Sequence, residues 1–156
     1  MRGGSRAVGR YGVAMEPAEI IAGTTKGVLA TVKRDGHPHL SNIYYVWDAA
    51  ARVARISTMA PRLKARVLAR NPAAALYVAG PHFYAWAVGE GDAELSPVTT
   101  EPGDEVAREL LPIYETFMGP QDEDELFKRL VEEQRLVIRL HVKRIYGMAL
   151  EADLSA

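Results

Sequence analysis

The sequence predicts a mainly β protein of the α+β class, built as a closed or half-closed antiparallel barrel with helices at its periphery. Short β-rich segments follow one another through brief turns, which is the pattern of hairpins in an antiparallel sheet. The helical segments are few and amphipathic, so each can cover an edge or end of the barrel with its apolar face. The chain of 156 residues is long enough for one domain with its own core.

The first three expected strands are separated by turn residues. Strands at residues 27–32 and 40–47 flank the sequence Arg34-Asp35-Gly36, which favours a hairpin because glycine tolerates a positive φ. A second turn at residues 48–50 leads into a third strand at 53–58, whose side chains alternate between two faces. We expect these strands to form a meander, each beside the next.

Helices and further strands share the rest of the chain. Apolar residues that recur every three or four positions indicate the helices, and a proline near a helix end marks its boundary. The expected helices span residues 18–22, 61–70, 104–117 and 123–133. The further expected strands span residues 74–79, 84–95 and 136–148.

The predicted domain organisation is one domain between two short ends. Residues 1–14 contain four glycines and three arginines without an apolar period, so we expect a flexible N-terminal arm. Residues 15–150 form the single barrel domain, and residues 151–156 form a tail.

Composition excludes several classes of protein. Apolar residues make up 48% of the chain and charged residues 25%, which is typical of a soluble globular protein. No segment approaches the roughly 20 apolar residues of a membrane helix, and no apolar stretch follows the basic start, so we expect a cytoplasmic protein without a membrane partner. The absence of cysteine excludes disulfides, thiolate metal sites and cysteine nucleophiles. The net charge of −1 argues against nucleic acid as a partner.

Charge is unevenly distributed along the chain. Residues 101–134 hold eleven acidic and three basic residues, whereas the rest holds nine acidic and sixteen basic ones. We interpret the acidic part as a solvated helical face. The basic part includes Arg62, Lys64 and Arg66 at an expected helix start, where the helix dipole disfavours cations. A phosphate-type ligand would make this cluster favourable, as would a carboxylate of the protein or solvent screening on a bare surface, and the spacing does not choose among the three.

Five stretches of the chain, taken in order, resemble a known family. They are residues 27–32, 35–42, 57–66 followed by Asn71-Pro72, 86–95 and 135–147. The family is that of the pyridoxamine 5'-phosphate oxidase-like flavin and deazaflavin proteins, which have a split β-barrel fold. Within it, the Pro-Arg-x-Lys-x-Arg form of the basic cluster and the strand with Ser-Asn are most similar to the small actinobacterial branch that binds coenzyme F420.

The resemblance implies a cofactor site. The cofactor would be the deazaflavin coenzyme F420, with FMN as the alternative, and the basic cluster would hold its phosphate. Backbone groups at the end of the third strand would face the ring system, and polar residues of the second strand would line the same groove. The residues that the resemblance assigns to cofactor binding are His39, Ser41, Asn42, Ser57, Thr58, Pro61, Arg62, Lys64 and Arg66.

The resemblance also implies an assembly and a reaction. The protein would be a homodimer with two cofactor clefts between the barrels, and the final strand and the region of Trp86 would contribute to the interface. The deazaflavin would transfer hydride to a small metabolite, so no side chain has to act as a nucleophile. The proton donor stays open among a tyrosine, a histidine and water, and no catalytic side chain is assigned.

Other functions remain beside that of an F420-dependent oxidoreductase. An FMN-binding protein related to pyridoxamine 5'-phosphate oxidase would use the same phosphate site, although oxidation of pyridoxamine phosphate itself would need a second basic cluster. A non-catalytic carrier of F420 or haem would share the fold. His37 and His39 lie on one strand face and could be half of a zinc site, with His82, His141 or a carboxylate as the third ligand. Without cysteine or an HExxH motif, we expect no metal.

Overall fold

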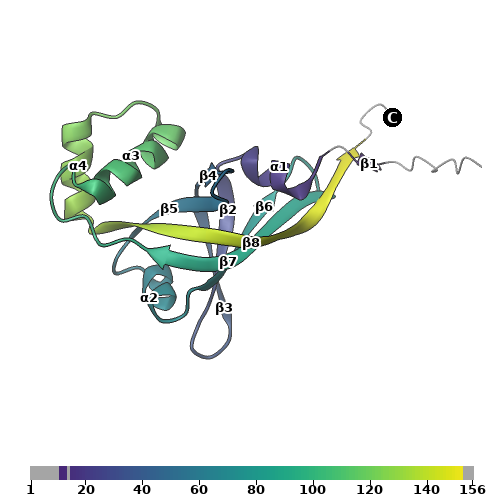
Figure 1. Ribbon diagram of the computed structural model, residues 1–156, viewed down its shortest axis with the longest axis horizontal. Helices are drawn as coiled ribbons and strands as arrows, with labels where there is room; N and C mark the ends of the chain where they lie inside the picture. The colour runs from purple at the N-terminus through teal and green to yellow at the C-terminus, as the bar shows by residue number, and fades with distance from the viewer. Residues whose placement is uncertain (1–10, 14, 153–156) are drawn as a thin grey trace, which may run out of the picture.

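The computed structural model describes residues 11–13 and 15–152, and it contains eight strands and four helices in that part of the chain (Figure 1). The strands and helices follow in this order: β1 (Tyr11–Val13), α1 (Pro17–Ala22), β2 (Lys26–Val32), β3 (Pro38–Tyr44), β4 (Val46–Asp48), β5 (Val53–Met59), α2 (Leu63–Arg70), β6 (Ala73–Ala79), β7 (Ala85–Leu95), α3 (Glu105–Met118), α4 (Glu123–Glu132) and β8 (Arg135–Ala152). The mainly β class with peripheral helices is confirmed.

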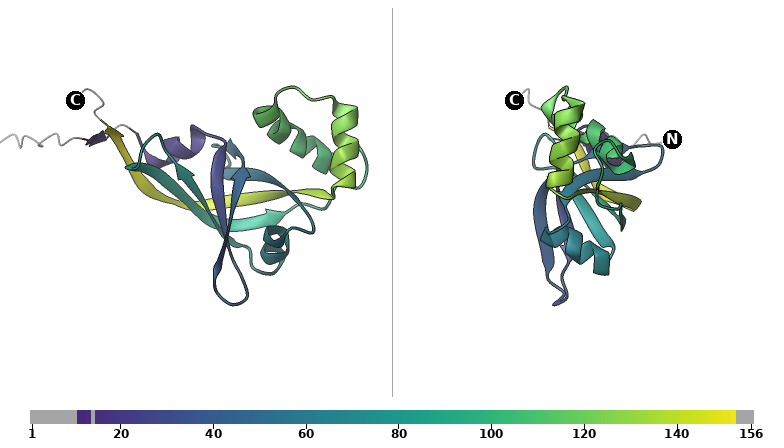
Figure 2. Two further views of the ribbon diagram at one scale, coloured as in Figure 1. Left: turned by 180° about the vertical axis from the view of Figure 1, so that it is seen from behind. Right: turned by 90° about the vertical axis from the view of Figure 1, so that its left-hand side faces the viewer.

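The sheet curls into a half-barrel. Seven strands are hydrogen-bonded in the order β3-β2-β6-β7-β8-β5-β4, and all of the pairs are antiparallel. The two outermost strands, β3 and β4, are consecutive in the chain and are joined at Tyr45, so one segment of backbone connects both ends of the curled sheet. This architecture is a split β-barrel, and Figure 2 shows the β2–β3 hairpin crossing the longer strands β7 and β8.

The expected meander is wrong in one respect. Residues 40–47 do not form a single strand, because the strand ends at Tyr44 and a new one begins at Val46. The ring of Tyr45 is 1% exposed, its hydroxyl donates a hydrogen bond to the Ile21 carbonyl at 2.5 Å, and its amide donates to the Thr25 carbonyl at 2.8 Å. The Thr25 contact continues the pairing with β2 as far as Tyr45, and the Ile21 contact holds the buried side chain where the strand ends. Because β3 pairs with β2 and β4 pairs with β5, β3 and β5 lie at different places in the sheet order.

The N-terminal segment also differs from the prediction. Tyr11–Val13 pair with Leu150–Ala152, so part of the expected flexible arm forms strand β1, and β8 runs four residues beyond its expected end at Met148. A short strand held by backbone hydrogen bonds needs no apolar pattern, so the sequence carries no signal for it. The rest of the predicted arm, residues 1–10 and 14, and residues 153–156 of the predicted tail lie outside the described residues.

The protein has two hydrophobic cores. The larger one fills the barrel and includes Leu29, Ile56, Leu76, Ile138 and Leu140, each fully buried. The smaller one lies between α3 and α4 and reaches the sheet at Val137; its members include Leu110, Ile113, Leu126 and Leu130. The α3–α4 pair therefore packs as a unit at the end of the sheet opposite to β1 (Figure 1). None of the helices in the described part of the chain is both long and apolar enough to cross a membrane.

Candidate functional site

A cleft of about 820 Å³ lies where the curled sheet meets α2 and α3. Its walls come from segments far apart in the sequence, and they combine cationic, aromatic and small apolar side chains. The lining residues are Thr24, Lys26, Gly27, Val28, Asn42, Ile43, Tyr44, Ser57, Lys64, Tyr77, Ala79, Ile113, Tyr114, Phe117 and Arg135. The volume is that of a typical site for a cofactor or small ligand.

One end of the cleft is cationic. Lys64, at the start of α2, lies there with Arg135 of β8. Partial burial, together with the positive charges of Arg62 and Arg135, lowers the pKa of Lys64 from its ordinary value. Arg135 forms an ion pair with Glu133 at 2.7 Å, whereas within the described residues no carboxylate pairs with Arg62, Lys64 or Arg66. Of the explanations that the sequence left open for this cluster, an internal carboxylate is not observed, whereas a phosphate-type ligand and solvent screening of the exposed Arg62 and Arg66 both fit.

The backbone at the same place also suits an anion. Helix α2 begins at Leu63, two residues later than expected, and its N-cap residue is Arg62. No side chain caps the helix, and its first turn contains no acidic residue. Helix N-termini present free N–H groups and a positive dipole end, which attract phosphate and carboxylate groups. The free backbone N–H groups at the start of α2 and the nearby side chains of Lys64, Arg62 and Arg66 together provide the hydrogen-bond donors and positive charge that bind a phosphate ester.

The other walls of the cleft are aromatic. The ring of Tyr44 stacks on Phe117 with 4.3 Å between ring centroids and 9° between ring planes. The hydroxyl groups of Tyr114 and Ser57 are hydrogen-bonded at 3.1 Å, which links α3 to β5. The ammonium group of Lys26 lies 5.9 Å from the centre of the Tyr44 ring. A planar conjugated ring system would find both flat apolar surfaces and hydroxyl groups here.

The structure brings three of the nine predicted site residues to this cleft. Asn42, Ser57 and Lys64 line it, from β3, β5 and α2. Pro61, Arg62 and Arg66 surround the start of α2 with exposed side chains, but they do not line the cleft. The position of these three is still close to the cationic end.

The remaining three predicted residues, His39, Ser41 and Thr58, do not line the cleft. Along β3 the exposed and less exposed residues alternate, so His39 and Ser41 share a face with Ile43, opposite Asn42, but only Ile43, at the end of the strand, reaches the cleft from that face. The Nδ1 atom of His39 and the Oγ atom of Ser41 are buried without a hydrogen-bond partner in the described structure. Thr58 is 2% exposed and alternates with Ser57 in the same way. The structure therefore does not place these three side chains with the cleft residues.

Several cleft residues were not predicted from the sequence. Lys26 and Arg135 are the first residues of β2 and β8, and isolated cations at strand starts match no motif. Ile113, Tyr114 and Phe117 belong to α3, where the helical spacing indicates only a buried face. That one end of this face also borders a cleft depends on how α3 docks on the sheet, which no local pattern shows.

The histidines considered for a zinc site do not come together. Nδ1 of the exposed His37, just before the edge strand β3, lies 3.4 Å from the Asp35 carboxylate. His141 lies on β8, several strands away, where it contacts Glu94 of β7. Among the residues that the structure describes, no three His, Asp or Glu side chains are placed so that they could hold a metal ion.

Comparison with known proteins places the chain in a family. The family model of pyridoxamine 5'-phosphate oxidase matches residues 15–149. The chain belongs to this family. The match includes β3, β5, the start of α2 and the residues between β5 and α2, which together contain the predicted cofactor residues.

Solved structures with the same fold show what the chain is similar to. A conserved hypothetical protein, Rv2991 of Mycobacterium tuberculosis, has 25% identity and a TM-score of 0.67, and the match covers 88% of this chain and 86% of that one. A protein described as an F420 reductase also has 25% identity, with a TM-score of 0.66 and coverage of 86% and 98%. HutZ, a heme storage protein of Vibrio cholerae, has 16% identity, a TM-score of 0.61 and coverage of 86% and 96%, so that similarity shows the fold alone.

Proposed function

We propose that this protein is an oxidoreductase that uses the deazaflavin coenzyme F420 to transfer hydride to a small metabolite. The observation that carries the proposal is the cleft whose cationic end lies at the uncapped start of α2 and whose walls are aromatic. The similarity to an F420 reductase at 25% identity supports the choice of deazaflavin.

The residues present fit such a cofactor. Lys64 and Arg135 would hold the phosphate, with the α2 amides and the nearby charges of Arg62 and Arg66 in support. Tyr44, Tyr77 and Phe117 would exclude water from the ring. When bound, the cofactor supplies or accepts the hydride. The Tyr114 hydroxyl, fixed by Ser57, is a group in the cleft that can donate a hydrogen bond to a substrate oxygen.

FMN is the second candidate because it carries a phosphate that the same cations would hold. A non-catalytic carrier of F420 or haem would use the same fold without turnover. Binding measurements with F420, FMN and haem, together with a test for turnover, distinguish these two possibilities from the main proposal.

The experiment is a titration of the purified protein with F420, FMN and haem, followed by fluorescence or absorbance. We expect F420 to bind more tightly than about 100 μM, which corresponds to roughly 5.5 kcal/mol. Replacing Lys64 with Ala should weaken binding by about tenfold or more, because a charge-assisted contact to the phosphate is lost. Lys33→Ala is the matched control, since Lys33 lies outside the cleft and is 4.0 Å from Asp35.

The outcomes distinguish the candidates. If neither F420 nor FMN binds below about 100 μM, the proposal is wrong. If FMN binds more tightly than F420, the cofactor is a flavin rather than a deazaflavin. Binding of F420 without any acceleration of its reoxidation, across a panel of conjugated carbonyl and nitro acceptors, would identify a carrier. An unchanged affinity in Lys64→Ala and Arg66→Ala would show that the phosphate is held elsewhere.

The proposal includes a homodimer in the cytoplasm. Tyr77, Trp86, Tyr146 and Met148 form an aromatic face on β6, β7 and β8, and Tyr77 also lines the cleft. A second copy of the chain that covers this face would lie next to the cofactor site.

A further inference from the structure

The α3–α4 pair is joined to the barrel mainly through one face of α3. It has its own small core, which reaches the sheet at Val137, and it stands at one end of the sheet (Figure 1 and the left view of Figure 2). Ile113, Tyr114 and Phe117 of α3 nevertheless form one wall of the cleft. The position of this wall therefore depends on how firmly α3 is attached to the strands beneath it.

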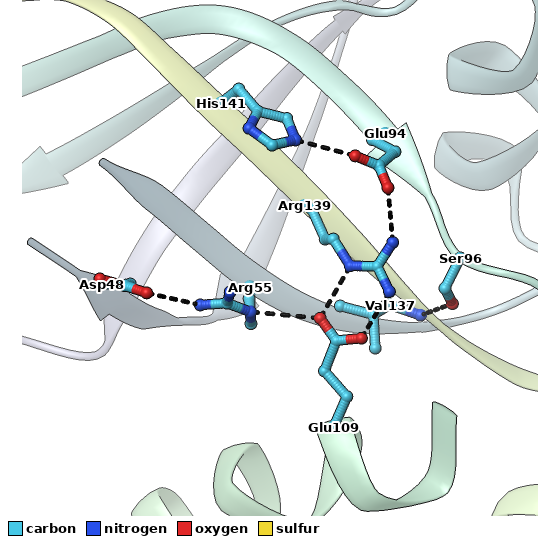
Figure 3. A network of polar contacts seen from close by, with 8 residues as sticks. All are labelled: Asp48, Arg55, Glu94, Ser96, Glu109, Val137, Arg139 and His141. Carbon is cyan, nitrogen blue, oxygen red and sulfur yellow. Dashed lines mark hydrogen bonds and ion pairs between the residues drawn. The ribbon is translucent and has the colours of Figure 1, made fainter. Parts of the chain in front are cut away.

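Glu109 is the main polar attachment. Its Oε1 accepts hydrogen bonds from Nε of Arg139 at 2.8 Å and from Nε of Arg55 at 3.2 Å, and its Oε2 accepts one from Nη2 of Arg139 at 2.6 Å. Figure 3 shows the carboxylate reaching from the helix to the two arginines on β8 and β5. A single carboxylate thus joins α3 to two neighbouring strands.

The two arginines are themselves held in place. Arg139 donates from Nη1 to Glu94 of β7 at 2.6 Å, and Arg55 donates from Nη1 to Asp48 of β4 at 3.3 Å (Figure 3). The hydrogen bonds and positive charges of Arg139 and Arg55 outweigh burial and lower the pKa of Glu109, so its carboxylate is charged at neutral pH. Charge-assisted, bidentate contacts of this kind restrict geometry more than single neutral hydrogen bonds do.

The helix geometry connects this attachment to the cleft. Ile113 is four residues and Phe117 eight residues beyond Glu109, so the three side chains follow one another on the same face of α3. A carboxylate fixed to two strands in the second turn of α3 sets the rotation and depth of that face for the turns that follow. The Ser57–Tyr114 hydrogen bond and the Tyr44–Phe117 stack are the contacts that this orientation allows.

We propose that Glu109 is a positioning residue for the cleft: by binding Arg139 and Arg55 it fixes the wall formed by Ile113, Tyr114 and Phe117 over the bound ring system. The inference rests on the proposed function for the identity of the ring, but the attachment of α3 can be tested without a cofactor. In this proposal, α2 and Arg135 bind the phosphate, whereas α3, held by Glu109, positions the wall of the cleft.

The first test uses the protein without cofactor. Hydrogen exchange, followed by mass spectrometry, is compared for the wild type, Glu109→Gln and the control Glu115→Gln, whose exposed carboxylate makes no hydrogen bond or ion pair in the described structure. Glu109→Gln should raise exchange about tenfold in residues 110–118, because charged hydrogen bonds are lost, and leave β6 and β7 unchanged. Glu109→Asp, which keeps the charge, should restore part of the protection. Equal exchange in Glu109→Gln and Glu115→Gln, or a uniform increase over all strands, would overturn the proposal.

The second test uses stopped-flow fluorescence with F420. Glu109→Gln should increase the dissociation rate about tenfold and lower the fluorescence anisotropy of the bound ring, because the ring loses a fixed wall while its phosphate contact remains. Arg139→Gln should have the same effect, and the double variant should be no worse than either single one. If the rates and anisotropy match those of Glu115→Gln, the inference is wrong. If the wild type binds neither F420 nor FMN, the proposed function fails, while the exchange experiment still decides the role of Glu109.

Discussion

At the scale of single residues, Asp104 shows how one carboxylate organises both a loop and a helix start. Its Oδ1 accepts hydrogen bonds from the Thr99 hydroxyl and the Ala107 amide, both at 2.8 Å. Its Oδ2 accepts from the amides of Thr100 at 3.0 Å and Glu101 at 3.3 Å. Burial raises the pKa of Asp104, but these four hydrogen bonds together lower it below its ordinary value. Asp104 thereby defines where α3 begins, and with it the position of Glu109.

We expect Asp104→Ala to lower the free energy of unfolding by about 1–2 kcal/mol, the usual effect of losing an N-cap. Asp122→Ala, at the N-cap of α4, should cost less, because among the described residues the Asp122 carboxylate accepts a single hydrogen bond, from the Glu125 amide at 3.1 Å. Urea unfolding measures both. Because the folded pKa lies below the ordinary 3.8, the stabilisation by Asp104 is present above that pH and is lost as the pH falls through the folded value. If the difference in free energy of unfolding between the wild type and Asp104→Ala does not become smaller as the pH falls, this account is wrong.

At the scale of elements, the pairing of β7 with β8 decides which side chains face outwards. The register shifts between Glu90 and Gly91, because Glu90 lies opposite Arg144 and Gly91 opposite Val142. This bulge keeps Asp92 and Glu94 on the face where they meet Lys143 and Arg139. A Cβ atom on Gly91 would lie 1.8 Å from the His141 carbonyl oxygen, so only glycine fits there.

Gly91→Ala should therefore destabilise the protein by about 3 kcal/mol or more, since the obstacle is backbone rather than a movable side chain. Gly36→Ala is the comparison: Gly36 has a φ of 85° but no atom within 4 Å of an added Cβ. Its replacement should cost only the conformational strain of about 1–2 kcal/mol. Urea unfolding of both variants would detect the difference, and a Gly91→Ala variant as stable as Gly36→Ala would show that the bulge can relax.

At the scale of the whole molecule, the aromatic face of β6, β7 and β8 is a group of neighbouring apolar side chains that a monomer leaves partly exposed. The rings of Tyr77 and Trp86 are 6.3 Å apart, and those of Trp86 and Tyr146 are 6.1 Å apart. Tyr77, Tyr146 and Met148 are each 38–42% exposed, which is high for such side chains on a sheet. Aromatic residues and methionine are enriched in protein interfaces, so we expect a second copy of the chain to cover this face.

Light scattering coupled to gel filtration should therefore give twice the chain mass of 17.1 kDa. Trp86→Glu should shift the protein towards the monomer, because a charge buried at the centre of an interface is strongly unfavourable. Met118→Glu is the control, since Met118 is 53% exposed at the end of α3, away from this face. A monomeric wild type, or a dimer that Trp86→Glu leaves intact, would refute the assignment of this face.

Local patterns predicted the elements of this fold well. Turn residues and side-chain alternation indicated β2, β5, β6, β7 and β8, although not β1 or the break between β3 and β4. The amphipathic spacing placed α3 and α4 within one residue of their observed ends. The cations at the start of α2 were recognisable because their position opposes the helix dipole. All of these signals lie within one or two turns of chain, so the sequence alone could determine the class of fold and the cationic end of the candidate site.

Only the tertiary structure decided which strands are neighbours and which residues share the cleft. The break at Tyr45 depends on a hydroxyl contact with Ile21, twenty-four residues away in the chain. The wall formed by α3 depends on Glu109 reaching Arg55, fifty-four residues earlier. Such contacts form only when the barrel closes and brings distant segments together. They produce no repeating pattern of residues along the chain, so the sequence does not reveal them. The physical reason for the division is therefore range: elements follow from local backbone preferences, whereas the site follows from long-range packing.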